Sequence, residues 1–241
     1  MEETKIITTN TIMPDIKRAL LNYLKVTEIE LDRRKFESTK KLAEAYKVYN
    51  NDEEFYIKET EEYIYNLFGW NESGNMCQPF FDSCMTQCKK RKIKSFMDFG
   101  GGIGTLSILA KLNGIEKVYY VDYSDGLGKC AKYLFEVFNI DVIMIDSRDF
   151  KDFKENVDVI AMFDVIEHIK NPVELMNQII LNLDPKFIYA TVCWDCSGGD
   201  HPMHYEYKMI FPTFMAAFGF AETIPSEFVR VIKWTATKGS V

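Results

Sequence analysis

The chain has 241 residues, 47% of them hydrophobic, and a formal net charge of −7. This length suits one α/β domain with an appendage, and the composition supplies a sizeable core. The negative charge disfavours a broad nucleic-acid surface, which normally needs a basic field, and favours a small-molecule ligand. No apolar run approaches the roughly 20 residues that span a bilayer, and the N-terminus lacks the apolar stretch of a signal peptide. We therefore expect a cytoplasmic protein without membrane insertion.

Residues 1–92 are expected to form a helical cap, because apolar side chains recur there at helical spacing. The expected helices start at Pro14 and cover roughly 31–49, 52–68 and 76–89, with Asp52 as an N-cap and a loop at 69–75. The basic run KKRKIK that follows is interpreted as a solvated connector to the second region, residues 93–241.

From Ser95 onward, short apolar runs alternate with helical patterns, which predicts an α/β fold with a parallel sheet and helices on both faces. The expected strands cover 95–99, 118–121, 141–145, 157–163 and 187–192, and the expected helices cover 105–112, 126–138, 173–183 and 208–218. The last two apolar runs, 221–224 and 228–235, are too close for a helical crossover. They should therefore pair antiparallel.

Residues 94–122 carry the most informative pattern: a strand, a glycine-rich turn, a helix and a second strand that ends in Asp122. Glycines allow a sharp turn and the close approach of a ligand, and the helix that follows presents unpaired N–H groups. An acid at the tip of the second strand suits a ribose diol. A nucleoside-containing cofactor fits this arrangement.

The spacing Asp98-x-Gly100-x-Gly102-x-Gly104 differs from the G-x-G-x-x-G of dinucleotide-binding enzymes. It resembles motif I of the class I methyltransferases that use S-adenosyl-L-methionine (SAM), and the similarity extends over about residues 94–220. The resemblance implies SAM as the cofactor, with Asp98 orienting the cationic end of its amino-acid tail. It also implies a Rossmann-like class I methyltransferase fold, with a seven-stranded, mostly parallel sheet that ends in an antiparallel hairpin.

Four consecutive expected strands end in an aspartate, namely Asp98, Asp122, Asp146 and Asp164. Because ligands of open α/β sheets bind beyond the carboxyl ends of the strands, we expect these acids to share a pocket. By the resemblance, Asp122 would hold the ribose hydroxyls and Tyr123 would lie near the adenine. Asp146, with Ser147, would accept from the adenine amine, and Phe163 and Asp164 would lie against the cofactor.

The candidates for catalytic residues are Glu167, His168, His201 and His204. A hydroxyl or ammonium nucleophile must lose a proton during methyl transfer, so a base near the methyl group helps. His204 is our first choice for this base or for a substrate contact, because it follows the fifth strand, where the family usually places substrate-binding residues. For His168, the "EH" pair is frequent in metal-free methyltransferases as a structural element beside the cofactor pocket.

Two metal sites are alternatives. Asp164, Glu167 and His168, with His204, resemble the E-x-x-E-H motif and later histidine of small-RNA 2′-O-methyltransferases, which hold a divalent ion. Here an aspartate replaces the first glutamate, which is also typical of metal-free relatives. Cys193-x-x-Cys196 with His201-x-x-His204 has the spacing of zinc ligands, but only four residues separate the pairs. The other cysteines are expected to be reduced and buried.

The favoured function is a SAM-dependent methyltransferase that acts on a small-molecule acceptor, with O-methylation ahead of N-methylation. The helical cap would cover the cofactor and shape the acceptor pocket, as similar caps do in small-molecule members of the family. The alternatives are a metal-assisted RNA 2′-O-methyltransferase, for which the acidic net charge is unfavourable, and a non-catalytic SAM-binding protein.

Overall fold

The computed structural model describes residues 6–49, 51–73, 77–191, 201–205, 220–222 and 231–236. Its α-helices are α1 (Thr9–Leu24), α2 (Glu28–Tyr46), α3 (Asp52–Lys58), α4 (Thr60–Glu72), α5 (Cys77–Lys90), α6 (Thr105–Leu112), α7 (Asp125–Val137) and α8 (Pro172–Leu183). Two short 3-10 helices are η1 (Phe150–Asp152) and η2 (Ile166–His168). The strands are β1 (Ser95–Phe99), β2 (Lys117–Asp122), β3 (Ile143–Asp146), β4 (Val159–Phe163), β5 (Phe187–Thr191), β6 (Phe220–Glu222) and β7 (Val231–Ala236).

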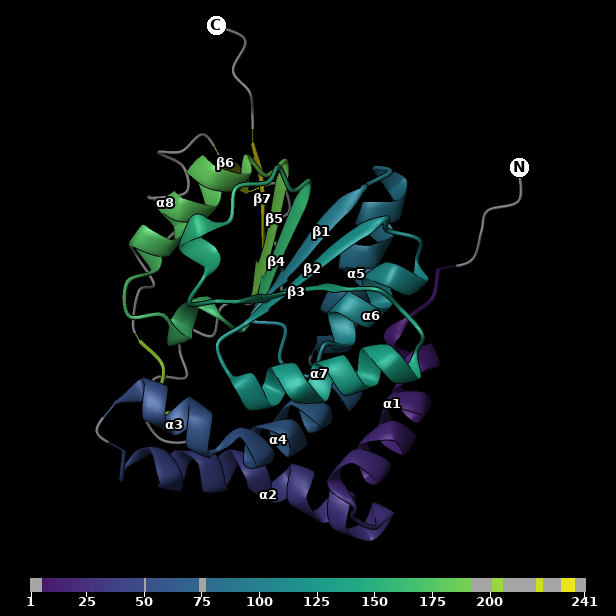
Figure 1. Ribbon diagram of the computed structural model, residues 1–241, viewed down its shortest axis with the longest axis vertical. Helices are drawn as coiled ribbons and strands as arrows, with labels where there is room; N and C mark the ends of the chain where they lie inside the picture. The colour runs from purple at the N-terminus through teal and green to yellow at the C-terminus, as the bar shows by residue number, and fades with distance from the viewer. Residues whose placement is uncertain are drawn as a thin grey trace, which may run out of the picture.

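The strands form one sheet in the order β3-β2-β1-β4-β5-β7-β6 (Figure 1). Strands β1 to β5 pair parallel, which confirms the expected α/β class. Strand β7 pairs antiparallel with both β5 and β6. The chain crosses from β3 to β4 past β2 and β1, so the carboxyl ends of β1 and β4 flank the point where the strand order reverses. Ligands of open α/β sheets bind at such a point.

Helices cover both faces of the sheet, as the alternating pattern predicts. On one face, buried side chains of α1, α4, α5, α6 and α7 pack with Phe96 and Tyr120 in a single cluster. On the other face, α8 and η1 pack against Met97 and Val121. Successive strand residues point to opposite faces, so both faces of these strands are buried and apolar.

Helix α1 differs from the expectation that Pro14 starts a helix. It begins at Thr9, and Pro14 lies inside it. The backbone nitrogen and hydroxyl of Thr9 both donate to Asp82 Oδ1, at 2.7 and 2.8 Å. A side chain 73 residues away thus satisfies the start of the helix, and no local pattern reports such a contact.

The helix expected over 52–68 is two helices, α3 and α4, which meet at Glu59. The N-cap is Asn51, whose side chain accepts from the Glu54 nitrogen, so the expectation that Asp52 is the cap is wrong. The loop expected at 69–75 is wrong for residues 69–72, because α4 continues to Glu72, and residues 74 and 75 lie outside the described residues. Gly69 lies inside this helix, where a Cβ would meet Lys35 at 3.2 Å, so glycine there allows α2 to pack closely on α4.

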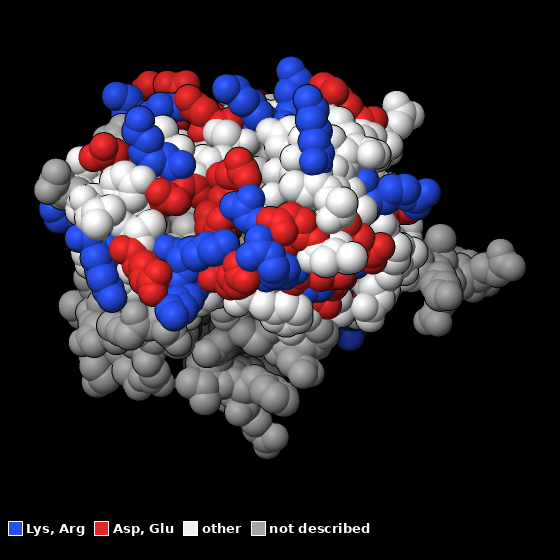
Figure 2. Space-filling model, turned by 90° about the horizontal axis from the view of Figure 1, so that it is seen from below, with Lys and Arg blue, Asp and Glu red and all other residues white. Residues whose placement is uncertain are grey.

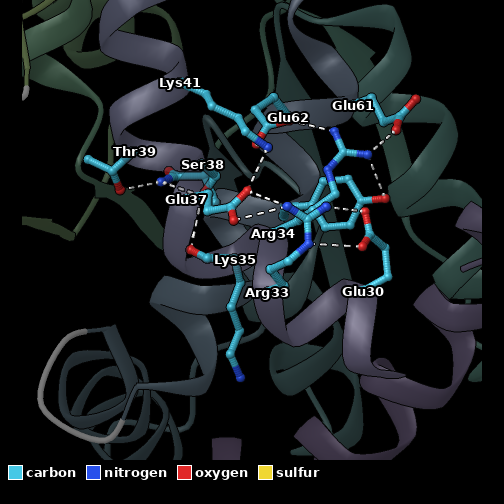
Figure 3. Close-up of polar contacts among 12 residues, drawn as sticks. Glu30, Arg33, Arg34, Lys35, Glu37, Ser38, Thr39, Lys41, Glu61 and Glu62 are labelled. Carbon is cyan, nitrogen blue, oxygen red and sulfur yellow. Dashed lines mark hydrogen bonds and ion pairs between the residues drawn. The ribbon is translucent and has the colours of Figure 1, made fainter. Parts of the chain in front are cut away.

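Helix α2 is held on α4 by ion pairs (Figure 3). The Arg34 guanidinium contacts Glu61 at 2.8 Å and Glu62 at 2.5 Å, and it lies 3.9 Å above the ring of Tyr65. In Figure 1, α2, α3 and α4 lie together across one end of the sheet. Among the helices that are described, none has the length and apolar character needed to cross a bilayer.

Candidate functional site

A cavity of about 540 Å³ lies between the N-terminal helices and the carboxyl ends of β1, β2 and β4. One side is formed by the glycine turn after β1, the end of β2 and the residues that follow β4. The other side is formed by α2, α3, α4, α5 and residues 201–205. The structure thus brings the expected site segments to one place and adds a wall from the first ninety residues.

Gly100, Gly101 and Gly102 line the cavity. Gly102 has a positive φ of 56°, and a Cβ there would lie 2.8 Å from Cδ1 of Leu67 on α4. Its nitrogen donates to Asp122 Oδ2 at 2.9 Å, and its carbonyl accepts from the buried Tyr120 hydroxyl at 2.6 Å. The backbone is therefore fixed in a conformation that leaves no room for a side chain, as close approach of a ligand requires.

Gly104, the last glycine of the expected motif, is not among the residues that line the cavity. It precedes α6 with a φ of 81°, and a Cβ would lie 2.7 Å from the ring of Phe135. The missing side chain of Gly104 therefore allows the start of α6 to pack closely against α7. The pattern of alternating glycines does not distinguish this packing position from the two at the cavity.

Asp98 is 5% exposed at the end of β1. Its Oδ2 accepts from both the backbone nitrogen and the hydroxyl of Ser107, at 3.0 and 2.8 Å, so it also caps the first turn of α6. Burial raises the pKa of Asp98 to about 7, against the lowering effect of the Ser107 hydrogen bonds. A cation bound beside this carboxylate would favour its ionised form.

Asp122 lies at the tip of β2, where its two oxygens accept from the Gly102 and Ser124 backbone nitrogens, both at 2.9 Å. Burial raises its pKa to about 6, although these backbone hydrogen bonds oppose the shift. The Ser124 hydroxyl in turn shares a hydrogen bond of 2.9 Å with the hydroxyl of Thr60 on α4. Helix α4 is thus hydrogen-bonded to the segment that follows β2, next to Asp122.

Four further expected cofactor residues line the same cavity, namely Tyr123, Ser147, Phe163 and Asp164. Asp146 is not among the lining residues. Its carboxylate accepts from the Arg148 side chain, whose hydrogen bonds lower the pKa of Asp146. Of the four strand-tip acids, Asp98, Asp122 and Asp164 thus line the cavity and Asp146 is paired with Arg148, so a contact of Asp146 with the adenine amine stays a prediction.

The three histidines of the chain gather in the cavity. The ring centroids of His168 and His204 lie 4.4 Å apart, and those of His201 and His204 lie 4.8 Å apart. The Tyr56 hydroxyl lies 2.7 Å from Nδ1 of His168. Burial, followed by the two neighbouring imidazoles, lowers the pKa of His168 to about 3, so this ring is uncharged at neutral pH.

Residues 201–205 are held in place from two sides. The Tyr205 nitrogen donates to the backbone carbonyl of Glu167 at 2.7 Å, and the Tyr205 hydroxyl donates to Asp52 at 2.6 Å. Asp52 accepts a second hydrogen bond from Tyr46, also at 2.6 Å. Tyr56 and Asp52 were missed as site residues, because their partners lie more than a hundred positions away and only the packing of α3 brings them together.

The model of a family described as a methyltransferase domain matches residues 58–200, more than half of the chain. The chain belongs to this family of SAM-dependent methyltransferases. Among curated proteins, none is significantly similar to the methyltransferase in sequence.

Solved structures share the fold at low sequence identity. Magnesium protoporphyrin IX methyltransferase (ChlM) from Synechocystis PCC 6803, with bound SAM, is 16% identical over 79% of the methyltransferase and 99% of that chain, with a TM-score of 0.59. N,N-8-amino-8-demethyl-D-riboflavin dimethyltransferase (RosA) from Streptomyces davawensis is 15% identical over 84% of the methyltransferase and 69% of that chain, with a TM-score of 0.56. The methyltransferase domain of bacterial CtHen1-C is 19% identical over 64% and 95%, with a TM-score of 0.50.

Of the two alternative metal sets, only Asp164, Glu167, His168 and His204 lie wholly within the described residues. Within the described ranges, no three histidine, cysteine, aspartate or glutamate residues are grouped so that they could hold a metal ion. Asp164, Glu167, His168 and His204 all line the cavity, but they do not form such a group. Cys193 and Cys196, proposed for zinc, lie outside the described residues. None of the four cysteines that are described forms a disulfide, and all four are buried.

Proposed function

We propose that the methyltransferase transfers a methyl group to an oxygen of a small molecule bound inside the cavity. The observation that carries this proposal is that one cavity of about 540 Å³ is lined on one side by the strand ends and on the other by the N-terminal helices. The glycine turn and Asp122 suit the cofactor on one side, and the cap supplies a wall for an acceptor on the other. A volume of this size is within the range of small-molecule sites.

SAM would be held by the residues that the sequence singles out. The bend at Gly100 to Gly102, which a Cβ would obstruct, gives its tail access to the main chain. Asp122 would bind the ribose hydroxyls, and Asp98 would orient the ammonium group of the tail. When bound, SAM supplies an activated methyl group on a positively charged sulfur. Tyr123, Ser147 and Phe163 would complete the wall beside the adenine.

The chain's own contribution to the reaction is alignment, exclusion of water and removal of a proton. His204 would accept the proton of the acceptor hydroxyl, since it lies in the cavity within the histidine cluster. Tyr56 would orient His168, which packs edge-on against His204. The Asp52 and Tyr205 hydrogen bond would keep residues 201–205 against the cavity.

A screen of wild-type protein for release of S-adenosylhomocysteine tests the proposal. Alcohols, phenols, amines, carboxylates and RNA would be offered in parallel, with and without a chelator. We expect release with a hydroxyl compound that is unaffected by the chelator. Release only with amines would replace O-methylation by N-methylation, and chelator-sensitive release with RNA would favour the metal-assisted alternative.

The His204→Ala variant tests the proposed base. It should keep the SAM affinity of the wild type, because His204 is on the acceptor side, and it should lower turnover by roughly 100-fold or more. If turnover were unchanged, His204 would not be the base. If SAM bound normally but the wild type turned over no acceptor class, the non-catalytic alternative would be favoured.

A further inference from the structure

The acceptor side of the cavity is aromatic. We call the lining residues of α2, α3, α4, α5 and 201–205 the acceptor wall. Its rings belong to Tyr56, Tyr63, Trp70, Phe81, His201 and His204. Several of these rings contact one another, with 5.4 Å between the centroids of Tyr56 and Tyr63 and 6.4 Å between those of Trp70 and His201. An acceptor with a planar ring could stack on the faces of these side chains or pack against their edges.

The described residues of the acceptor wall carry no permanent positive charge. Among them are no lysine and no arginine, and they include the carboxylate of Asp52. Glu167 and His168, which adjoin the wall, add a buried acid and an uncharged imidazole. Of the described residues that line the whole cavity, the one lysine is Lys170, whose side chain is exposed beyond η2.

The basic side chains of α2 do not line the cavity. Figure 2 shows acidic and basic side chains interleaved over the face that the N-terminal helices present. Arg34 pairs with Glu61 and Glu62, and Lys41 lies 3.0 Å from Glu37 (Figure 3). The basic side chains of α2 are thus matched to carboxylates outside the cavity. A negatively charged acceptor in the cavity would therefore not meet the basic side chains of α2, and Lys170 is the one lysine on the described lining that it could meet.

From this distribution we infer that the acceptor is a planar ring compound whose hydroxyl or amine is methylated and which carries no phosphate or carboxylate group. This inference rests on the proposed function, whose acceptor class it narrows. An anionic group moved from water to this wall loses its hydration and meets no lysine or arginine on the part of the wall that is described. A neutral or cationic ring meets aromatic faces and carboxylates, both of which attract it.

The bonds, electrons and proton of the methyl transfer can all be accounted for with such an acceptor. A lone pair on the acceptor oxygen or nitrogen forms the new bond to the methyl carbon, while the bond between that carbon and the SAM sulfur breaks. The bonding electrons stay on sulfur, which becomes the neutral thioether of S-adenosylhomocysteine. The acceptor proton leaves to an imidazole nitrogen of the cluster and then to water. No oxidant, reductant or further reactant is needed.

Matched pairs of acceptors test the inference. Each pair would contain a phenol or aromatic amine and the same ring with an added carboxylate or phosphate, and release of S-adenosylhomocysteine would be measured for both. We expect kcat/KM at least about tenfold higher for the member without the anionic group. Equal or higher values for the anionic members would overturn the inference and leave methyl transfer standing.

Two further outcomes separate this inference from the proposal beneath it. If titration shows SAM binding and no ring compound is turned over, the substrate class is wrong. If SAM does not bind, the proposed function itself fails.

A charge-bearing variant provides a second readout. Thr39 lines the cavity from α2, so Thr39→Arg should raise kcat/KM for the anionic member relative to its neutral partner by about tenfold. Ser83→Arg is the matched control, because Ser83 is exposed on α5 and does not line the cavity. It adds the same charge and should leave the ratio unchanged. An equal change of the ratio in both variants would contradict the inference.

Discussion

The Tyr56 hydroxyl lies 2.7 Å from Nδ1 of His168, although 112 positions separate the two residues. This contact joins a short helix of the cap to the segment that follows β4, and both residues line the cavity. Burial raises the pKa of Tyr56 well above its ordinary value, so its hydroxyl keeps its proton at neutral pH. The pair is therefore uncharged, and it fixes the orientation of the His168 ring.

Removal of the Tyr56 hydroxyl should therefore affect catalysis more than cofactor binding. We expect Tyr56→Phe to lower kcat by about tenfold and to change the SAM affinity by less than about twofold. The matched control is Tyr23→Phe, because Tyr23 packs against Tyr133 and does not line the cavity. Steady-state kinetics with any active acceptor and SAM titration would give both values. A loss of SAM affinity without a loss of kcat would disprove the orienting role.

Gly102→Val should abolish SAM binding, because a side chain at this position meets Leu67 and occupies the approach to the main chain. Gly114→Ala is the control for backbone strain, since Gly114 also has a positive φ, of 87°, but no atom lies within 4 Å of its missing Cβ. Both substitutions should cost about 1–2 kcal/mol of stability for the left-handed conformation. Only Gly102→Val should remove the heat of SAM binding in a calorimetric titration. Equal SAM affinities in the two variants would contradict the proposal that SAM binds along the bend at Gly100 to Gly102.

SAM affinity should rise with pH between about 5.5 and 8. Burial raises the pKa of Asp98 to about 7 and that of Asp122 to about 6, and both would bind SAM in their ionised forms. Below these values a bound cation must first displace protons, so the dissociation constant at pH 5.5 should be about tenfold higher than at pH 8. Titrations in buffers of different ionisation enthalpy should report proton release at pH 6.5. A flat pH profile would contradict the pairing of Asp98 with the ammonium group.

The same two acids should contribute less to the stability of the ligand-free protein as the pH rises from about 4 to 7. Both folded-state pKa values lie above the ordinary value of 3.8, so in this interval these two groups bind more protons in the folded state than in the unfolded state. Their contribution to the free energy of unfolding therefore falls with rising pH until both are ionised, whereas the lowered pKa of His168 acts in the opposite direction. Asp98→Asn should reduce this slope in denaturant titrations at pH 5 and 7, whereas an unchanged slope would show that Asp98 does not contribute.

The cap should depend on Arg34 for its attachment. The Arg34 side chain is 20% exposed and its partner Glu62 only 9%, so Arg34→Ala leaves a nearly buried carboxylate without this partner. We expect a loss of about 2 kcal/mol in the free energy of unfolding. Arg33→Ala is the control on the same helix, because Arg33 pairs with Glu30 and Glu37 at 52% exposure and should cost less than about 1 kcal/mol. Equal losses, measured by urea denaturation, would count against the buried pair.

Local patterns predict the sheet better than the cap. The strand Ser95–Phe99 and the helix Thr105–Leu112 have the expected bounds, because glycines and apolar periodicity define them within a few residues. The start of α1 and the break at Glu59 depend on tertiary contacts, such as that of Thr9 with Asp82. Such contacts leave no mark in the neighbouring sequence.

The candidate site follows the same division. The turn at Gly100 to Gly102, Asp98, Asp122 and the three histidines meet in one cavity, as their positions at strand ends predict. Asp146 is not among the residues that line this cavity, and its carboxylate accepts a hydrogen bond from Arg148, two residues later. Tyr56 could not be found from the sequence, since its aromatic ring fits a core position on an amphipathic helix equally well. Its place in the cavity depends on how α3 packs.

A crystal structure with S-adenosylhomocysteine would test the central claim most directly, because the claim is that cofactor and acceptor share one cavity beneath the cap. The account predicts the ligand along the bend at Gly100 to Gly102, with its ribose hydrogen-bonded to Asp122 and its sulfur facing the side that carries His204. Ligand density outside this cavity, or a sulfur that faces away from the acceptor wall, would contradict it.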